Sequence, residues 1–98
     1  MYWVYILYSP TLNKFYKGQT KDLNARVFRH QHNWERFTKS ASDWELVWAS
    51  QKPNRTQALQ LESKLKNLNR VRTNSFIFKY KEDLVLEESL VKTMLCMS

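Results

Sequence analysis

Two short runs rich in aromatic and β-branched residues, residues 2–8 and 14–20, open this chain and restrict its fold more than any other feature. Runs of this composition favour β-strands. The connection between them, residues 10–13, contains a proline and an asparagine, which are common in turns. The pattern therefore predicts an antiparallel hairpin at the start of the fold.

Alternation within this hairpin brings two tyrosines together. Successive side chains of a strand point to opposite faces, so Trp3, Tyr5 and Leu7 share one face of the first strand. Tyr16 and Gly18 share one face of the second strand. When the two strands pair in register, Tyr5 and Tyr16 become neighbours.

A helix is expected next, opening at Leu23 behind the N-capping residue Asp22. Arg26 and His30 lie four residues apart and therefore stack on one face of this helix. On an adjacent face, the apolar side chains follow roughly helical spacing toward a core: Leu23, Val27 and Trp34.

The middle of the chain predicts a third strand and a second helix. After a polar loop at 36–43, residues 44–50 alternate like a strand. Asn54 begins a capping-box pattern, and the helix that follows runs to about Arg70. One stripe of this helix is apolar: Ala58, Leu61, Leu65 and Leu68. Glu62 lies at the edge of the stripe, where a carboxylate is partly desolvated yet reachable from a groove.

The last part of the chain predicts an extended piece and a final helix. Residues 70–75 are polar, residues 76–80 are expected to be extended, and residues 83–96 are expected to be helical. The final helix has a broad apolar face: Leu86, Leu90, Val91, Met94 and Leu95. Such a face either completes the core or pairs two chains. We expect the first, and hence a monomer, because a domain of 98 residues has little apolar surface to spare; a homodimer through this helix is the alternative.

Composition indicates one soluble domain, residues 1–98, with a polyanion as its partner. The chain has 16 Lys and Arg against 9 Asp and Glu, for a net charge of +7. The single cysteine, Cys96, cannot form an intramolecular disulfide. The N-terminus lacks the basic segment of a signal peptide, and no apolar stretch approaches the roughly 20 residues of a membrane span. We expect a cytoplasmic protein that does not bind membranes.

Several side chains could together cleave a phosphodiester. This reaction needs an activated water, positive charge at the phosphate and usually a divalent metal. Glu62 offers a hard oxygen ligand suited to magnesium, and Arg26 offers a fixed fork for a phosphate. His30 or Tyr16 could accept the proton of the water, and Gly18 removes bulk where a backbone or phosphate approaches closely. Taken singly, each also fits a structural role, and Glu62 could simply pair with the lysine four residues later.

Other chemistries have no support. His30 and His32 are two residues apart, which places them about 200° apart on a helix and rules out a shared zinc. The sequence has no phosphate-binding loop, no glycine-rich dinucleotide fingerprint and no G-x-S-x-G motif. Nucleotide-dependent and acyl-transfer reactions are therefore not expected.

In order along the chain, Trp3-Val4-Tyr5, the run from Tyr16-Lys17-Gly18 to Arg26, and then His30 and Glu62 resemble the GIY-YIG nuclease superfamily. The resemblance covers about residues 2–74 and is closest to the small single-domain members found in bacteria. It implies an α+β fold, with a central three-stranded antiparallel sheet flanked by helices. It also implies a cleavage centre lined by Tyr5, Tyr16, Arg26 and His30, with a tyrosine as general base, and one divalent metal, Mg²⁺ or Mn²⁺, bound by Glu62.

The same resemblance extends to nucleic-acid contacts, which are assigned to Gly18, Gln19, Lys21 and Asn74. Two departures stand out: Trp3 and Lys17 replace a glycine and an isoleucine of the family motif. Because the catalytic side chains are all present, an active enzyme is favoured over an inactive one.

The sequence thus predicts a metal-dependent endonuclease that acts on DNA, with RNA as the alternative substrate, and that selects structure rather than sequence. Two other functions stay open. One is a nucleic-acid-binding module without catalysis, and the other is an interaction subunit of a larger nuclease.

Overall fold

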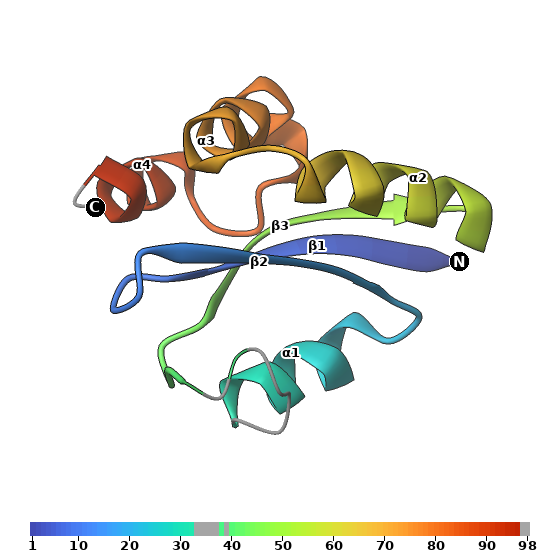
Figure 1. Cartoon of the computed structure of the whole chain (residues 1–98), viewed down its shortest axis with the longest axis horizontal. Coiled ribbons are helices and arrows are strands. Elements are labelled where there is room, and N and C mark those ends of the chain that lie inside the picture. The colour runs from blue at the N-terminus through green and yellow to red at the C-terminus, as the bar shows by residue number, and fades with distance from the viewer. Residues whose placement is uncertain (33–37, 39, 97–98) are drawn as a thin grey trace.

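The computed structural model describes residues 1–32, 38 and 40–96. Three antiparallel strands, β1 (Tyr2–Ser9), β2 (Lys14–Thr20) and β3 (Glu45–Lys52), form a sheet in the order β2-β1-β3. Helix α1 (Leu23–Gln31) covers one face of the sheet, and α2 (Arg55–Lys66), α3 (Arg70–Lys79) and α4 (Glu88–Cys96) lie on the other (Figure 1). This is the predicted α+β architecture.

The hairpin forms as predicted, and Asn13 closes it. Asn13 has a positive φ of 53°, a conformation that asparagine tolerates better than most residues. Its backbone N–H donates to the Ser9 carbonyl at 2.7 Å, and its side-chain oxygen accepts from the Tyr8 hydroxyl at 2.7 Å. The resulting register places Tyr5 opposite Gly18 and Leu7 opposite Tyr16.

A β-bulge shapes the other side of the sheet. Ile6 pairs with Trp48, but the next residue, Leu7, pairs with Leu46, so Val47 is an extra residue in β3. The bulge allows Val47 and Trp48, although consecutive, to join the same buried cluster. The sheet thereby gains apolar surface on the face that carries three helices.

Two clusters of side chains make the core, one on each face of the sheet. The larger cluster, toward α2, α3 and α4, contains Val4, Ile6, Tyr8, Val47, Trp48, Ala58, Leu65, Ile77, Val91 and Leu95. The smaller cluster, toward α1, contains Tyr5, Leu7, Trp44 and Ala49. Two of the expected core residues of α1, Leu23 and Val27, pack on the smaller cluster; Trp34 lies outside the described residues.

Both predicted helix starts are confirmed. The Asp22 carboxylate accepts from the N–H of Ala25 at 3.1 Å, and the Asn54 side chain accepts from the N–H of Gln57 at 2.9 Å. Each cap satisfies a backbone donor that has no partner within the helix.

The prediction for residues 67–80 is wrong. The helix that starts after Asn54 ends at Lys66 rather than near Arg70, and residues 70–79, expected to be polar loop and extended chain, form α3. Asn69 caps this helix by accepting from the N–H of Arg72 at 2.9 Å. The run Phe76-Ile77-Phe78 has strand-like composition, but as a helix it buries Ile77 completely and sets the Phe76 ring 5.2 Å from that of Trp48. Packing on the sheet overrides local propensity here.

The final helix is shorter than predicted. Residues 81–83 form a turn of 3₁₀ helix, and the chain then pairs with β3, where the N–H of Val85 donates to the carbonyl of Val47 at 3.1 Å. Helix α4 begins only at Glu88. Val91 and Leu95 are buried in the larger cluster, as expected for a helix that completes the core, whereas Leu90 is 48% exposed. No helix in the described part of the chain has the length and apolar character needed to cross a bilayer.

Candidate active site

Three aromatic rings from two strands and one helix meet on the α1 side of the sheet. The ring centroids of Tyr16 and His30 are 4.5 Å apart, those of Tyr5 and His30 are 5.8 Å apart, and those of the two tyrosines are 6.3 Å apart. The Tyr5 hydroxyl and Nε2 of His30 share a hydrogen bond of 2.9 Å. The structure therefore brings together three of the residues predicted to act in cleavage.

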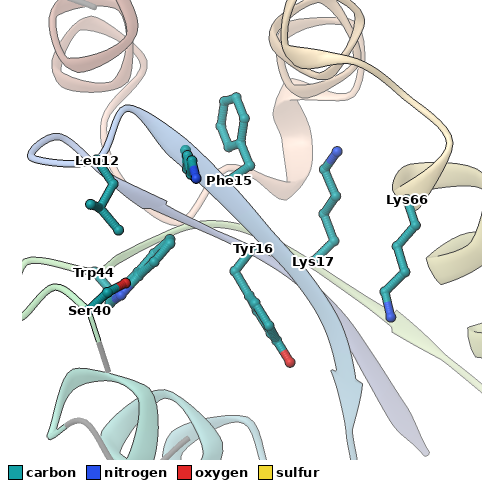
Figure 2. Close-up of a pocket in the computed structure, with 8 residues that line it drawn as sticks. Leu12, Phe15, Tyr16, Lys17, Ser40, Trp44 and Lys66 are labelled. Atoms are coloured by element: carbon teal, nitrogen blue, oxygen red, sulfur yellow. The ribbon is translucent and has the colours of Figure 1, made fainter. Parts of the chain in front are cut away.

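The three rings differ in their access to solvent. Tyr5 and His30 are completely buried, whereas Tyr16 is half-buried. Tyr16 lines a groove of about 670 Å³ at the outer edge of β2, together with Leu12, Lys14, Phe15, Lys17, Ser40, Trp44 and Lys66. Figure 2 shows the Tyr16 side chain pointing from β2 toward the α1 side of the sheet, with its hydroxyl farthest from the strand. Tyr16 is thus the member of the cluster that a bound molecule in this groove would meet.

Gly18 makes room for the Tyr5 side chain. A Cβ at position 18 would lie 2.6 Å from Oη and 2.8 Å from Cζ of Tyr5, and 3.1 Å from the Tyr16 ring. Real side chains do not approach so closely, so glycine is required for the tyrosine pair to pack. The group that approaches position 18 most closely in the structure is the phenol of Tyr5.

Gly18→Ala is therefore expected to displace Tyr5 and break its hydrogen bond with His30. Because both residues are fully buried, the overpacking should cost about 1–3 kcal/mol of unfolding free energy. Thermal or urea unfolding would measure this cost, and Asn24→Ala, at an exposed position of α1, is a control for a change that displaces no buried side chain. Unchanged stability together with an unshifted His30 imidazole signal by NMR would contradict this packing role.

Thr38 is a further part of the site that the sequence did not reveal. Its hydroxyl lies 2.9 Å from Nδ1 of His30, and its backbone carbonyl accepts from the indole N–H of Trp44 at 2.8 Å. In a neutral imidazole one nitrogen donates and the other accepts. One of the two hydroxyls, Tyr5 or Thr38, therefore donates to the ring while the other accepts from it. No local motif marks this threonine, because its role depends on how the chain returns from α1 to β3.

Thr38→Val should leave Nδ1 of His30 buried without its hydroxyl partner, which costs about 1–3 kcal/mol of unfolding free energy. Thr38→Ser keeps the hydroxyl and should recover most of this loss. The nitrogen chemical shifts of the His30 ring would report the change in hydrogen bonding directly. Equal stability of the valine and serine variants would contradict the role of the hydroxyl.

Arg26 lies one helical turn before His30 on α1 and is half-buried. The two residues lie four positions apart on α1, as expected, but His30 is completely buried whereas Arg26 is only half-buried, so the two side chains are in different environments. His32, the second residue of the H-x-H pattern, is exposed, and its Nδ1 lies 2.9 Å from the carbonyl of Phe28. The two histidines engage different groups.

Glu62 approaches β2 from the opposite layer. Its side chain is only 16% exposed, and Oε1 accepts from the Gln19 amide at 3.5 Å while Oε2 lies 3.5 Å from the Lys66 ammonium. Gln19 and Tyr16 project from opposite faces of the same edge strand. The groove that contains Tyr16 reaches Lys66, the partner of Glu62, so the two layers meet at the edge of β2.

A magnesium site at Glu62 is compatible with these contacts. Among the described residues there is no group of three or more histidine, cysteine or acidic side chains that could hold a metal. Magnesium often keeps several waters and needs only one or two carboxylates. Both contacts of Glu62 are long for hydrogen bonds, so the carboxylate keeps capacity for a cation.

The other residues predicted to contact nucleic acid are dispersed. Lys21 lies at the far end of β2, where its ammonium is 5.3 Å from the centre of the Tyr2 ring. Asn74 is on α3, and its Oδ1 is buried with no hydrogen-bond partner among the described residues. An amide oxygen in that state has unused capacity to accept a hydrogen bond. Neither residue lines the groove at Tyr16.

The two departures from the family motif have structural explanations. Trp3 packs, half-buried, against the cluster around Tyr5 and Leu7. Lys17 points away from Tyr16, as expected, and its ammonium donates to the carbonyl of Leu68 at 3.1 Å. Burial holds the pKa of this lysine below its ordinary value.

Comparison with known proteins supports the resemblance seen in the sequence. The model of the GIY-YIG catalytic domain matches residues 1–90. Among solved structures, the chain is similar to the UPF0213 protein BH0048 from Bacillus halodurans, determined in solution by NMR. The two share 25% sequence identity with a TM-score of 0.52, over 79% of this chain and 83% of that chain. Comparison with curated proteins gives no match. The chain belongs to the GIY-YIG catalytic domain family, which implies a nuclease-type function.

Proposed function

We propose that this protein is a metal-dependent endonuclease that hydrolyses phosphodiester bonds at the groove beside Tyr16. The observation that carries the proposal is the hydrogen bond of 2.9 Å between Tyr5 and His30, packed against a third ring that reaches the groove. All three residues stand at positions that match the family motif. A cluster serving only the core would not need two phenols and an imidazole.

The cluster supports a path for the proton that leaves the attacking water. Tyr16 would act as a phenolate, having released its hydroxyl proton to solvent at the groove; it would accept the proton of the water, become a neutral phenol and later return that proton to solvent. The hydrogen-bonded Tyr5–His30 pair would hold the Tyr16 ring in position. With Thr38 accepting from Nδ1, Nε2 of His30 would accept the hydrogen bond of the Tyr5 hydroxyl. The new bond forms between water oxygen and phosphorus, the bond to the leaving oxygen breaks, and that oxygen takes a proton from solvent.

The charges around the phosphate would come from Arg26 and from Glu62. The planar guanidinium of Arg26 suits two oxygens of a phosphate and would neutralise the charge that develops in the transition state. Glu62 would hold a magnesium ion, which when bound supplies Lewis-acid stabilisation of the leaving oxygen. The 3.5 Å contact with Lys66 would keep the carboxylate oriented.

We expect selectivity for the structure of the substrate rather than for its sequence. The net charge of +7 favours any polyanion, and the sequence contains no motif that reads bases in a groove of the duplex. DNA is the expected substrate, with RNA as the alternative. The protein is expected to act as a monomer.

A panel of labelled DNA and RNA oligonucleotides, with single-stranded, nicked and branched structures, tests this function. Each would be incubated with magnesium, manganese or chelator. Endonucleolytic products that depend on metal are the expected result. Binding without cleavage under every condition would favour a binding module, and cleavage only with added cell extract would favour a subunit of a larger nuclease.

A further inference from the structure

A second groove continues from the first one on the other side of the edge strand. It has a volume of about 270 Å³ and is lined by Asn13, Lys14, Phe15, Lys17 and Arg70. Lys14, Phe15 and Lys17 line both grooves. The first groove includes Tyr16 and Trp44 from the α1 side of the sheet, whereas Arg70 belongs to α3 on the other side. The two grooves therefore follow one path around the outer edge of β2.

The charge along this path is of one sign. Lys14, Lys17, Lys66 and Arg70 contribute to its walls, and none of the described residues that line either groove is acidic. A third groove, of about 300 Å³ near α3, shows the contrast, because Glu82 and Asp83 line it beside two lysines. The path at β2 has the uniform positive charge that suits a chain of phosphates. A groove of about 250 Å³ lined by Lys64, Arg72 and Lys79 is basic as well, but among the residues described to line it there is no member of the ring cluster, whereas the path at β2 includes Tyr16.

The Lys17 side chain is already ordered in a position where it could bind a phosphate. Its ammonium is already fixed by the bond to the carbonyl of Leu68, so binding would cost little additional side-chain entropy. One of its three donors is used there, which leaves two for a phosphate. Lys14 is exposed beside it and adds a second charge. Lysine at position 17 is also a departure from the family motif, so the motif does not account for an ammonium at this place in the groove.

The shape of the path favours a single strand over a duplex. A ligand that occupies both grooves must turn around one edge strand, and strands in a sheet are only about 5 Å apart. Duplex DNA has a persistence length of about 50 nm and cannot follow so tight a turn, whereas a single strand can. Phe15 and Tyr16 are half-buried on opposite faces of this edge, where each offers an aromatic surface to an unpaired base.

We propose that one unpaired nucleic-acid strand leaves the cleavage centre over the outer edge of β2 and is held on the far side by Lys14 and Lys17. The identity of the ligand rests on the proposed function, but the location of the binding surface does not require cleavage. The strand would meet Tyr16 in the first groove and the two lysines where the first groove continues into the second. The lysines thereby direct the backbone of the strand away from the scissile phosphate.

The test is fluorescence anisotropy of a labelled single-stranded oligonucleotide of mixed sequence, measured in chelator over a range of salt. The double variant Lys14→Gln, Lys17→Met is compared with Lys81→Gln, Lys92→Gln, which removes two charges near α4 and so has the same net charge. Loss of two phosphate contacts should make the salt slope shallower by about 1.4 and raise Kd about 25-fold at 0.1 M salt. The control pair should change Kd by less than about threefold, and the single variant Lys14→Gln should show about half of the slope change.

Three outcomes would overturn the proposal. The two double variants could weaken binding of the single strand equally, or the Lys14→Gln, Lys17→Met variant could bind it as tightly as the wild type while circular dichroism shows that the variant is folded. The third outcome is that this variant loses as much affinity for a duplex of the same sequence as for the single strand. A separate cleavage assay distinguishes failure of the function. If the wild-type protein binds the strand through Lys14 and Lys17 but never cuts it, the proposed binding surface is supported and the nuclease function is refuted. If it cuts normally but binds independently of these lysines, only the groove is refuted.

Discussion

Glu62→Ala is expected to abolish metal-dependent cleavage while leaving the protein folded. The proposed magnesium ion supplies several kcal/mol of transition-state stabilisation, so its loss should lower the rate by about 10³-fold or more. The carboxylate makes only two contacts that the structure records, both of 3.5 Å. Its removal should therefore change the free energy of unfolding by no more than about 1 kcal/mol. Single-turnover cleavage and urea unfolding would measure the two quantities.

Lys66→Met is the matched control, because it removes the other half of the same ion pair. If Glu62 serves only to pair with Lys66, both variants should lose equally little stability and both should cleave. The metal role requires a large difference: Lys66→Met should retain cleavage within about tenfold, since it removes one long contact that orients the carboxylate and at most one contact to a phosphate, but leaves the metal ligand in place. A Glu62→Ala protein that unfolds, or one that still cleaves with magnesium, would remove Glu62 from the proposed centre.

Arg26→Lys is expected to separate binding from catalysis. The ammonium of lysine keeps the charge that attracts a phosphate but lacks the planar pair of donors that fits two phosphate oxygens. The rate should therefore fall on the order of 10²–10³-fold, while affinity for nucleic acid changes little. Arg29→Lys, three residues later on α1, is a control on the exposed surface of the same helix. Near-normal turnover by Arg26→Lys would exclude the guanidinium from the transition state.

Local signals account for the parts of the fold that sequence analysis predicted. The hairpin depends on two strand-like runs and a turn within the first 20 residues, and its register then places Tyr5 beside Tyr16. Asp22 and Asn54 cap the helices that they were expected to cap. Each of these features depends on residues close together in the chain, so the sequence contains most of the relevant information.

Helix α3 shows where local information was insufficient. The run from Phe76 to Phe78 has the composition of a strand, yet its helical state is stabilised by Asn69 at the N-cap and by burial of Ile77 against the sheet. The start of α4 was also misplaced, because residues 84 and 85 are held by contacts with β3 that no local pattern indicates. Tertiary contacts determine the secondary structure of both segments.

The candidate site also has features that the sequence predicted and features that depend on tertiary structure. The two tyrosines, the arginine, the histidine and the glutamate were proposed from their resemblance to the GIY-YIG family, and the structure brings three of them into contact. The burial of His30 and its bond with Thr38 were not predictable, because they depend on the return of the chain from α1 to β3. The basic path at Lys14 and Lys17 also requires the knowledge that β2 is the edge strand.

The most direct test of the account is single-turnover cleavage by the purified wild-type chain beside Tyr16→Phe, on the oligonucleotide that the panel identifies as the best substrate. Tyr16 is the ring that reaches the groove, and replacing its hydroxyl leaves the packing of the cluster in place. We predict cleavage by the wild type with magnesium, none in chelator, and a loss of about 10²-fold or more for Tyr16→Phe. Cleavage that persists in chelator, or that is equally fast for Tyr16→Phe, would contradict a metal-dependent nuclease centred on this tyrosine.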